Sequence, residues 1–270
     1  MHERVSINSI CFAGDPVPKL ADRCSQLRAR RVSLISQQLA DGVEPLRAAL
    51  APAGLRIETI CHPFLPGRHL TPDEDAWCEA RAQLMRSIDS AAALGARSIY
   101  MLTGGHGSLT WEDAAAAFSA AIAPCVAHAA NAGVALMIEN APTLYADIHI
   151  AHSLRDAVAL AELAGIGVCI DLFSCWTEAG LRESMVRSMP RCRLIQVSDY
   201  VYGDRSLPAR AVPGDGAIPL KRILGWILEA GYAGAFDLEL IGPRIEREGR
   251  LEAVGRAARE LGAALQSLGA

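Results

Sequence analysis

The chain has 270 residues, about half of them hydrophobic, and a formal net charge of −4. A chain of this length can bury a sizeable core without disulfides or structural metals. The charge balance excludes the basic face that a nucleic-acid-binding protein needs, and no apolar run approaches the ~20 residues of a membrane-spanning helix.

The eight cysteines contain no CxxC pair, and Cys11, Cys61 and Cys169 lie inside apolar runs. Cysteine in such a run behaves as a small hydrophobic residue, whereas disulfide frameworks are typical of small secreted domains. The first residues show no basic segment followed by an apolar segment and a cleavage site, the pattern of a signal peptide. We therefore expect a cytoplasmic protein that neither crosses nor binds a membrane.

Strand-like apolar runs alternate with helical stretches through the first half of the chain. The pattern predicts strands over Val5–Phe12, Val32–Ser36, Leu55–Cys61 and Ser98–Leu102, followed in turn by helices over Asp22–Arg30, Val43–Ala51, Thr71 or Pro72 to Leu94, and Thr110–Asn131. Gly95 is placed to end the third of these helices, because glycine readily adopts the left-handed conformation of a helix C-cap.

The second half of the chain repeats the pattern. It predicts strands over Val134–Glu139, Gly167–Asp171, Leu194–Val197 and Phe236–Leu240, and helices over Leu154–Ala164, Leu181–Met189, Leu220–Ala230 and Glu246–Leu268. Eight βα units in this length favour one (β/α)₈ TIM barrel that occupies residues 1–270 as a single domain. The loop from Asp199 to Ala217 is long for a βα connection, and we expect it to cover a substrate.

Four polar side chains stand where apolar strands end: Glu139, Asp171, Gln196 and Glu239. The carboxyl ends of barrel strands meet at one face, so these side chains are expected to converge. Three carboxylates and an amide oxygen suit Mg²⁺ or Mn²⁺, with Co²⁺ or Zn²⁺ as further options, and a divalent ion would relieve their mutual repulsion. The alternative is that each acid caps the next helix or pairs with an arginine.

Other side chains on this face are candidates for substrate contacts: His62, His106, Trp176, Arg205 and Arg210. A histidine there could hold a substrate hydroxyl, and an arginine could bind a carboxylate or a polar sugar group. The alternatives are histidines satisfied by backbone groups, a tryptophan packed under the loop and arginines in solvent. The glycines of TGGHG and PGDG lack the continuation of a P-loop and are read as tight turns.

Five stretches resemble the xylose-isomerase-like TIM-barrel superfamily, the sugar phosphate isomerases and epimerases related to endonuclease IV. They are MIEN at 137–140, CIDLFSCW at 169–176, LIQVSD at 194–199, RAVPGDG at 210–216 and GYAGAFDLELIGPRI at 231–245. The resemblance implies one divalent metal bound by Glu139, Asp171, Gln196 and Glu239. It also implies that the two glutamates transfer protons.

The chain departs from the family pattern at two positions. Ser174 stands where many members carry a histidine that touches substrate, and it is a candidate contact in its place. Gln196 stands where many members carry a histidine ligand. The glutamine form resembles hydroxypyruvate isomerases and some 3-dehydroshikimate dehydratases, while the loss of the histidine at 174 argues against that dehydratase and against a standard ketose 3-epimerase.

We therefore expect an isomerase or epimerase of a small sugar or polyhydroxy ketone, acting through a metal-stabilised enediolate with Glu139 and Glu239 as acid and base. One alternative is a lyase on the same scaffold, a 3-dehydroshikimate-type dehydratase or an enzyme that eliminates from a 3-oxo-sugar or its glycoside. A non-catalytic binding barrel is another. A DNA-repair nuclease would need more histidine ligands and a basic face. The expected partner is a carbohydrate-like small molecule, and a homo-oligomer remains open.

Overall fold

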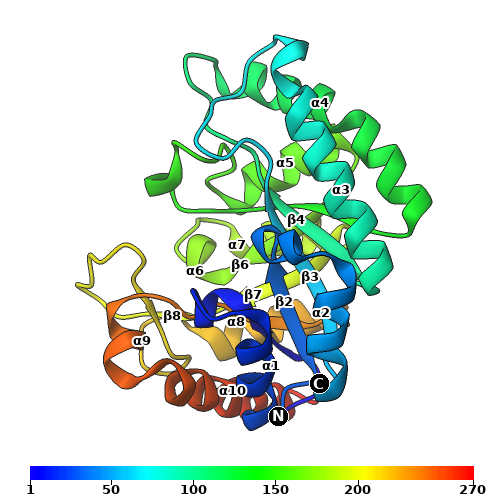
Figure 1. Cartoon of the computed structure of the whole chain (residues 1–270). Helices are drawn as coiled ribbons and strands as arrows, with labels where there is room; N and C mark the ends of the chain where they lie inside the picture. Colours follow the sequence, from blue (N-terminus) through cyan, green and yellow to red (C-terminus); the bar gives the residue numbers. More distant parts are fainter.

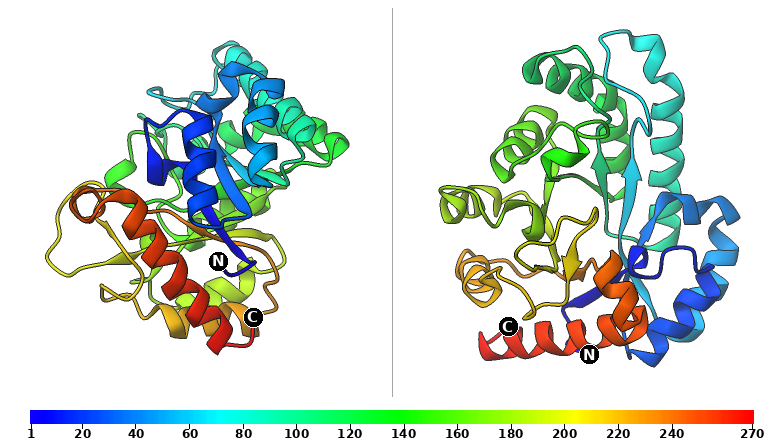
Figure 2. Two further views of the ribbon diagram at one scale, coloured as in Figure 1. Left: turned by 60° about the horizontal axis from the view of Figure 1, so that its bottom comes forward. Right: turned by 90° about the vertical axis from the view of Figure 1, so that its left-hand side faces the viewer.

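The computed structural model describes residues 1–270, apart from the side chain of Glu74. Eight parallel strands close into a barrel in the order β1-β10-β7-β6-β5-β4-β3-β2, with helices around it (Figure 1). The (β/α)₈ TIM barrel expected from the sequence is confirmed. The chain ends meet where the barrel closes, and the His2 ring lies 3.0 Å from the carbonyl oxygen of Ala270 (Figure 2).

The barrel strands are short and lie close to the predicted runs. They are β1 (Val5–Asn8), β2 (Arg31–Ile35), β3 (Arg56–Pro63), β4 (Ser98–Leu102), β5 (Ala135–Glu139), β6 (Gly167–Asp171), β7 (Cys192–Val197) and β10 (Phe236–Leu238). A separate antiparallel pair, β8 (Asp199–Tyr200) with β9 (Arg210–Ala211), lies within the long loop after β7.

The outer layer consists of α1 (Val17–Gln26), α2 (Val43–Leu50), α3 (Cys78–Leu94), α4 (Trp111–Ala132), α5 (Leu154–Ala164), α7 (Leu181–Ser188), α8 (Leu220–Glu229) and α10 (Arg250–Ser267). Shorter helices lie in the connections: α6 (Leu172–Cys175), α9 (Pro243–Glu248) and the 3₁₀ turns η1 (Ser9–Phe12), η2 (Ser36–Asp41), η3 (Ala51–Ala53), η4 (Glu74–Trp77) and η5 (Thr143–Tyr145). Gly95, with φ of 72°, ends α3 as predicted.

Four predicted boundaries are wrong for local reasons. Helix α3 begins at Cys78 instead of Thr71 or Pro72, because the Asp73 side chain accepts from the amide of Asp75 and starts the separate 3₁₀ turn η4. The first strand ends at Asn8, because the Asn8 side chain accepts a hydrogen bond from the amide of Ile10 and starts the η1 turn. Helix α1 begins at Val17 instead of Asp22, since proline fits the first turn of a helix. The last helix is interrupted at Gly249, whose φ of 96° separates α9 from α10.

Helix α4 is long and apolar enough, by length and composition alone, to cross a membrane. In this fold it packs between α3 and α5, and its buried side chains are mainly alanines together with Phe118 and Ile122. Its first turn carries Glu112 and Asp113. The helix therefore belongs to the outer layer of the barrel.

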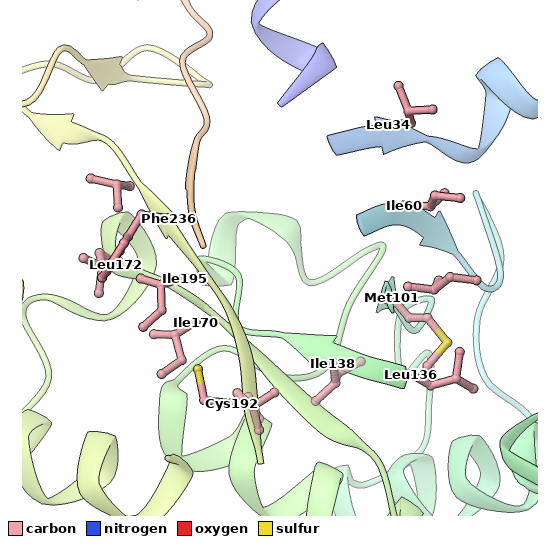
Figure 3. Close-up of a cluster of buried hydrophobic side chains, with 14 of the residues drawn as sticks. Leu34, Ile60, Met101, Leu136, Ile138, Ile170, Leu172, Cys192, Ile195 and Phe236 are labelled. Carbon is pink, nitrogen blue, oxygen red and sulfur yellow. The ribbon is translucent and has the colours of Figure 1, made fainter. Parts of the chain in front are cut away.

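Alternation along the strands separates two apolar layers. One set of side chains points outward against the helices, as Ile170, Ile195 and Phe236 do on neighbouring strands (Figure 3). Their strand neighbours form a smaller cluster of Tyr100, Met137, Cys169, Leu194 and Ala235. Because side chains two residues apart share one face of a strand, the residues that end β5, β6 and β7 continue this inner layer toward the barrel mouth.

Candidate active site

The strand ends bring the four predicted residues to one end of the barrel. Glu139 and Asp171 are the last residues of β5 and β6, Gln196 lies near the end of β7, and Glu239 follows β10 directly. Asp171 and Gln196 are register partners across β6 and β7. All four are buried, with Glu139 and Glu239 6% and 7% exposed and the other two fully enclosed.

A side chain that the sequence analysis did not single out fixes the spacing between β5 and β6. The Asn140 amide donates to the carbonyl oxygen of Asp171 at 3.0 Å, and its oxygen accepts from the Asp171 backbone amide at 3.0 Å. The last residues of the two strands are thereby tied together. Asparagine directly after the strand-end glutamate, in MIEN, is the signal that could have revealed this role.

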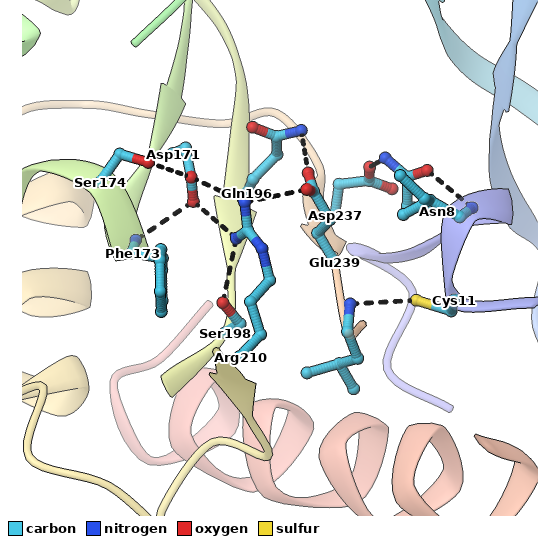
Figure 4. Close-up of polar contacts among 12 residues, drawn as sticks. Asn8, Cys11, Asp171, Phe173, Ser174, Gln196, Ser198, Arg210, Asp237 and Glu239 are labelled. Carbon is cyan, nitrogen blue, oxygen red and sulfur yellow. Dashed lines mark hydrogen bonds and ion pairs between the residues drawn. The ribbon is translucent and has the colours of Figure 1, made fainter. Parts of the chain in front are cut away.

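The guanidinium of Arg210 lies among the acids (Figure 4). It makes two hydrogen bonds to the Asp171 carboxylate, of 3.1 and 3.0 Å, and its Nη2 lies 2.9 Å from Glu239 Oε1. A further bond of 3.1 Å reaches the hydroxyl of Ser198. Arg210 is 6% exposed, so it acts as a buried counter-ion for two of the four predicted ligands.

The position of Arg210 depends on the loop after β7. Arg210 begins β9, which pairs with β8, and the Asp199 carboxylate accepts hydrogen bonds from the amides of Tyr200, Gly214, Gly216 and Ile218. A side chain at Gly216 would collide with Asp199, because a β-carbon there would lie 2.3 Å from Oδ1. The PGDG segment is thus a tight turn around a buried carboxylate, as predicted.

The sequence left two alternatives to metal binding for each acid, namely capping of the next helix and pairing with an arginine. Asp171 does both. It caps α6 by accepting from the amide of Phe173 at 3.1 Å, and it forms the ion pair with Arg210. Its Oδ2 also accepts from the Ser174 hydroxyl at 2.5 Å. Ser174, proposed as a substrate contact, is therefore engaged with Asp171 in this structure.

Gln196 and Glu239 form the other half of the cluster. The Gln196 amide donates to Glu239 Oε2 at 2.6 Å, while the buried Oε1 of Gln196 has no hydrogen-bond partner in the described part of the chain. Burial raises the pKa of Glu239 to about 7, although Arg210 opposes the shift. Burial and the nearby Glu239 and Asp171 raise the pKa of Glu139 well above its usual value.

The donor set fits a hard divalent cation. Three carboxylates and an unpartnered buried amide oxygen are the ligands that Mg²⁺ and Mn²⁺ prefer, and an unsatisfied buried acceptor is unfavourable unless a cation or donor reaches it. As the side chains stand, no group of three His, Cys, Asp or Glu within the described residues is arranged around one ion position. Arg210 instead supplies positive charge between Asp171 and Glu239.

The other side chains predicted to contact substrate lie in different parts of the structure. His62 does not join the cluster, because it alternates with Cys61 on β3 and its Nδ1 lies 3.0 Å from the Ser87 hydroxyl on α3. His106 is exposed in the loop after β4. Trp176 and Arg205 lie beside the barrel mouth, where Trp176 approaches Tyr200 and Arg205 donates to the Tyr200 hydroxyl at 2.7 Å.

Two further residues near the cluster were not among the predicted site residues. The electrostatic environment of the half-buried Tyr145 includes Arg210, Glu239, Asp171 and Glu139. His149 is fully buried, accepts from the Thr103 amide and lies 2.8 Å from the Glu139 carbonyl oxygen. Burial lowers the pKa of His149 to about 4, so a neutral imidazole supports the end of β5.

Comparisons with known proteins agree with this architecture. A family model described as "Xylose isomerase-like TIM barrel" matches residues 22–264. No curated protein matches the sequence significantly. A solved protein from Sinorhizobium meliloti shares 25% identity over 97% of this chain and 98% of its own, with a TM-score of 0.84.

Two more distant structures share the fold. The IolI protein, solved with a zinc atom, has 15% identity and a TM-score of 0.82 over 98% of this chain and 99% of its own. The D-psicose 3-epimerase of Clostridium cellulolyticum H10, solved with D-tagatose, has 14% identity and a TM-score of 0.76 over 98% of both chains.

Proposed function

This chain belongs to the xylose isomerase-like TIM barrel family, and from that membership we propose that it is an isomerase or epimerase of a small sugar or polyhydroxy ketone. The observation that carries the proposal is the buried set of oxygen donors at the ends of β5, β6, β7 and β10. Among the structural relatives, the D-psicose 3-epimerase acts on sugars of this class and IolI contains a metal.

In this proposal, Glu139 and Glu239 exchange the proton α to a substrate carbonyl. Removal of that proton by one glutamate gives an enediolate. Return of a proton to the same carbon from the opposite side, by the other glutamate, gives the epimer. Return of a proton to the former carbonyl carbon, with transfer of the hydroxyl proton to the former carbonyl oxygen, gives the isomer. Arg210 lies 2.9 Å from Glu239 and neutralises this carboxylate while no cation is bound. Asn140 and Ser174 hold the Asp171 side of the site in place.

The residues that would hold a divalent ion are Glu139, Asp171, Glu239 and the unpartnered Oε1 of Gln196. The ion would supply Lewis-acid polarisation of the substrate carbonyl. The all-oxygen donor set favours Mn²⁺ or Mg²⁺ over Zn²⁺, even though IolI was solved with zinc.

Hydrogen–deuterium exchange tests the acid–base assignment. The full chain is incubated in D₂O with Mn²⁺ and a panel of ketoses that includes D-psicose and D-tagatose, and deuterium entry α to the carbonyl is followed by NMR. Replacement Glu239→Gln should slow exchange by at least about 100-fold, because a general base contributes on that order. Undiminished exchange in this variant would contradict the proposal.

Glu58→Gln is the matched control. Glu58 is also buried, but it lies near the start of β3, at the end of the strand away from the candidate site, and pairs with Arg31 at 2.5 Å. This variant should therefore retain exchange. Product analysis separates the lyase alternative, since loss of water or an aglycone would identify elimination. A cytoplasmic location fits cysteines that are mostly buried and pack as small hydrophobic residues.

A further inference from the structure

Four aromatic side chains form a continuous strip beside the acid cluster: Phe173, Trp176, Tyr200 and Tyr202. The Phe173 and Tyr200 ring centres lie 6.0 Å apart, and Tyr200 lies 6.3 Å from both Trp176 and Tyr202. At its inner end, the Arg210 guanidinium lies 4.8 Å from the centre of the Phe173 ring. The aromatic strip therefore begins beside Arg210, the residue that contacts Asp171 and Glu239.

The outer end of the aromatic strip reaches solvent. The chain is only 5% aromatic, yet Tyr202 is 74% exposed at the end of this row of rings. Leu207 on the same loop and Leu144, next to Tyr145, are also exposed. An exposed ring at the end of a row of packed rings that begins at a candidate active site indicates a binding surface.

The inner part of the strip is held in place before any ligand arrives. Phe173, Trp176 and Tyr200 pack against the hydrophobic core. The Tyr200 hydroxyl donates to the carbonyl oxygen of Asp204 at 2.8 Å and accepts from Arg205 at 2.7 Å. A fixed aromatic surface costs little ordering entropy on binding.

We infer that the substrate has two parts: a polyhydroxy carbonyl end at the carboxylates and a flat apolar ring, such as an aryl aglycone, along the aromatic strip. This inference rests on the proposed function and narrows its substrate class. Direct continuity with the buried acids favours one small molecule that spans both surfaces. One exposed and three half-buried aromatic side chains also offer less than the ~800 Å² per partner that a stable protein interface needs.

Matched glycosides provide the test. Binding of phenyl 3-oxo-β-D-glucopyranoside and methyl 3-oxo-β-D-glucopyranoside, which both keep a ketone between two hydroxyl groups, to the full-length, Mn²⁺-treated protein is measured by NMR titration. The phenyl compound should bind about tenfold more tightly, the gain expected from one good aromatic contact. Tyr202→Ala should remove most of that advantage without disturbing the core, because Tyr202 is largely exposed. Trp176→Ala should also remove most of it, and because Trp176 packs against the core, the NMR spectrum of this variant is first compared with that of the folded wild type.

Leu163→Ala, at a 55% exposed position on α5, is the control and should leave the tenfold preference intact. Equal binding of the two glycosides, binding of neither, or a preference that survives both aromatic replacements would overturn the inference. If the two glycosides bind equally and the aromatic variants differ from the wild type in molar mass, the aromatic strip is a contact between copies of the chain. This result would also overturn the inference. Intact α-proton exchange alongside any of these results would leave the proposed function standing.

Discussion

Removal of the Arg210 guanidinium should destabilise the metal-free protein strongly. The Arg210→Gln variant loses two hydrogen bonds to Asp171 and the ion pair with Glu239, and it leaves these buried carboxylates without their counter-ion. Removing one partner of a buried ion pair typically costs about 3–5 kcal/mol. We expect a loss of that size in the free energy of unfolding, measured by urea denaturation at pH 7 in the presence of EDTA.

The same variant should bind a divalent ion more tightly than the wild-type chain. In the wild type, an ion must displace Arg210 from Asp171 and Glu239, and each 1.4 kcal/mol of that displacement weakens binding about tenfold. Arg210→Gln removes this competition. Its Kd for Mn²⁺, measured by calorimetry, should therefore fall by at least about tenfold, and Mn²⁺ should restore most of the lost stability.

Arg256→Gln is the matched control for the loss of an arginine. Arg256 binds both oxygens of Asp215 at 2.7 Å and also contacts Glu248, but its side chain is 31% exposed. Solvent-exposed ion pairs contribute about 1 kcal/mol or less. Equal destabilisation of the two variants, or an unchanged Mn²⁺ affinity in Arg210→Gln, would refute the assignment of Arg210 as the resident counter-ion.

Three further predictions concern other parts of the fold. Burial lowers the pKa of His62 from 6.5 to about 4. The neutral imidazole therefore stabilises the fold above pH 6.5, and about 3 kcal/mol of unfolding free energy is lost as the pH falls from 6.5 toward 4. His62→Gln should flatten the plot of unfolding free energy against pH over this range. Asp199→Asn replaces a carboxylate that accepts from four amides and should cost about 3 kcal/mol, with faster proteolysis between 199 and 217 as a second measurement. Gln196→His offers a nitrogen ligand and should raise the affinity for Zn²⁺ relative to Mg²⁺ by about tenfold or more in a competition titration; an unchanged ratio would show that residue 196 does not contact the ion.

The strand-end residues were predictable because they break a strong local pattern. Glu139, Asp171 and Gln196 each follow a short apolar run, and Glu239 follows a run interrupted by the buried Asp237. The closed parallel topology then forces the ends of these runs to one face. Both facts follow from hydrophobic periodicity and from the count of βα units, so the barrel and the convergence of its polar ends could be foreseen.

The contacts made by individual side chains could not be foreseen in the same way. Arg210 reaches the acids through a two-residue antiparallel pair that Asp199 holds in place across a loop, and no sequence period describes such a pair. His62 follows Cys61 and so points to the opposite side of β3, but the choice between the two sides depends on strand register. Loop conformation and strand register are therefore what the sequence pattern leaves undetermined.

The Asp171 carboxylate accepts four hydrogen bonds from within the chain: one each from the Phe173 amide and the Ser174 hydroxyl, and two from Arg210. Proteins whose ligand residues have no such internal partners often fold only when the metal arrives. Here the strand-end acid is satisfied beforehand. If the proposed metal site is correct, the barrel can therefore complete its folding before it acquires an ion, and a newly made chain can persist without metal as an intact protein that is still able to bind it.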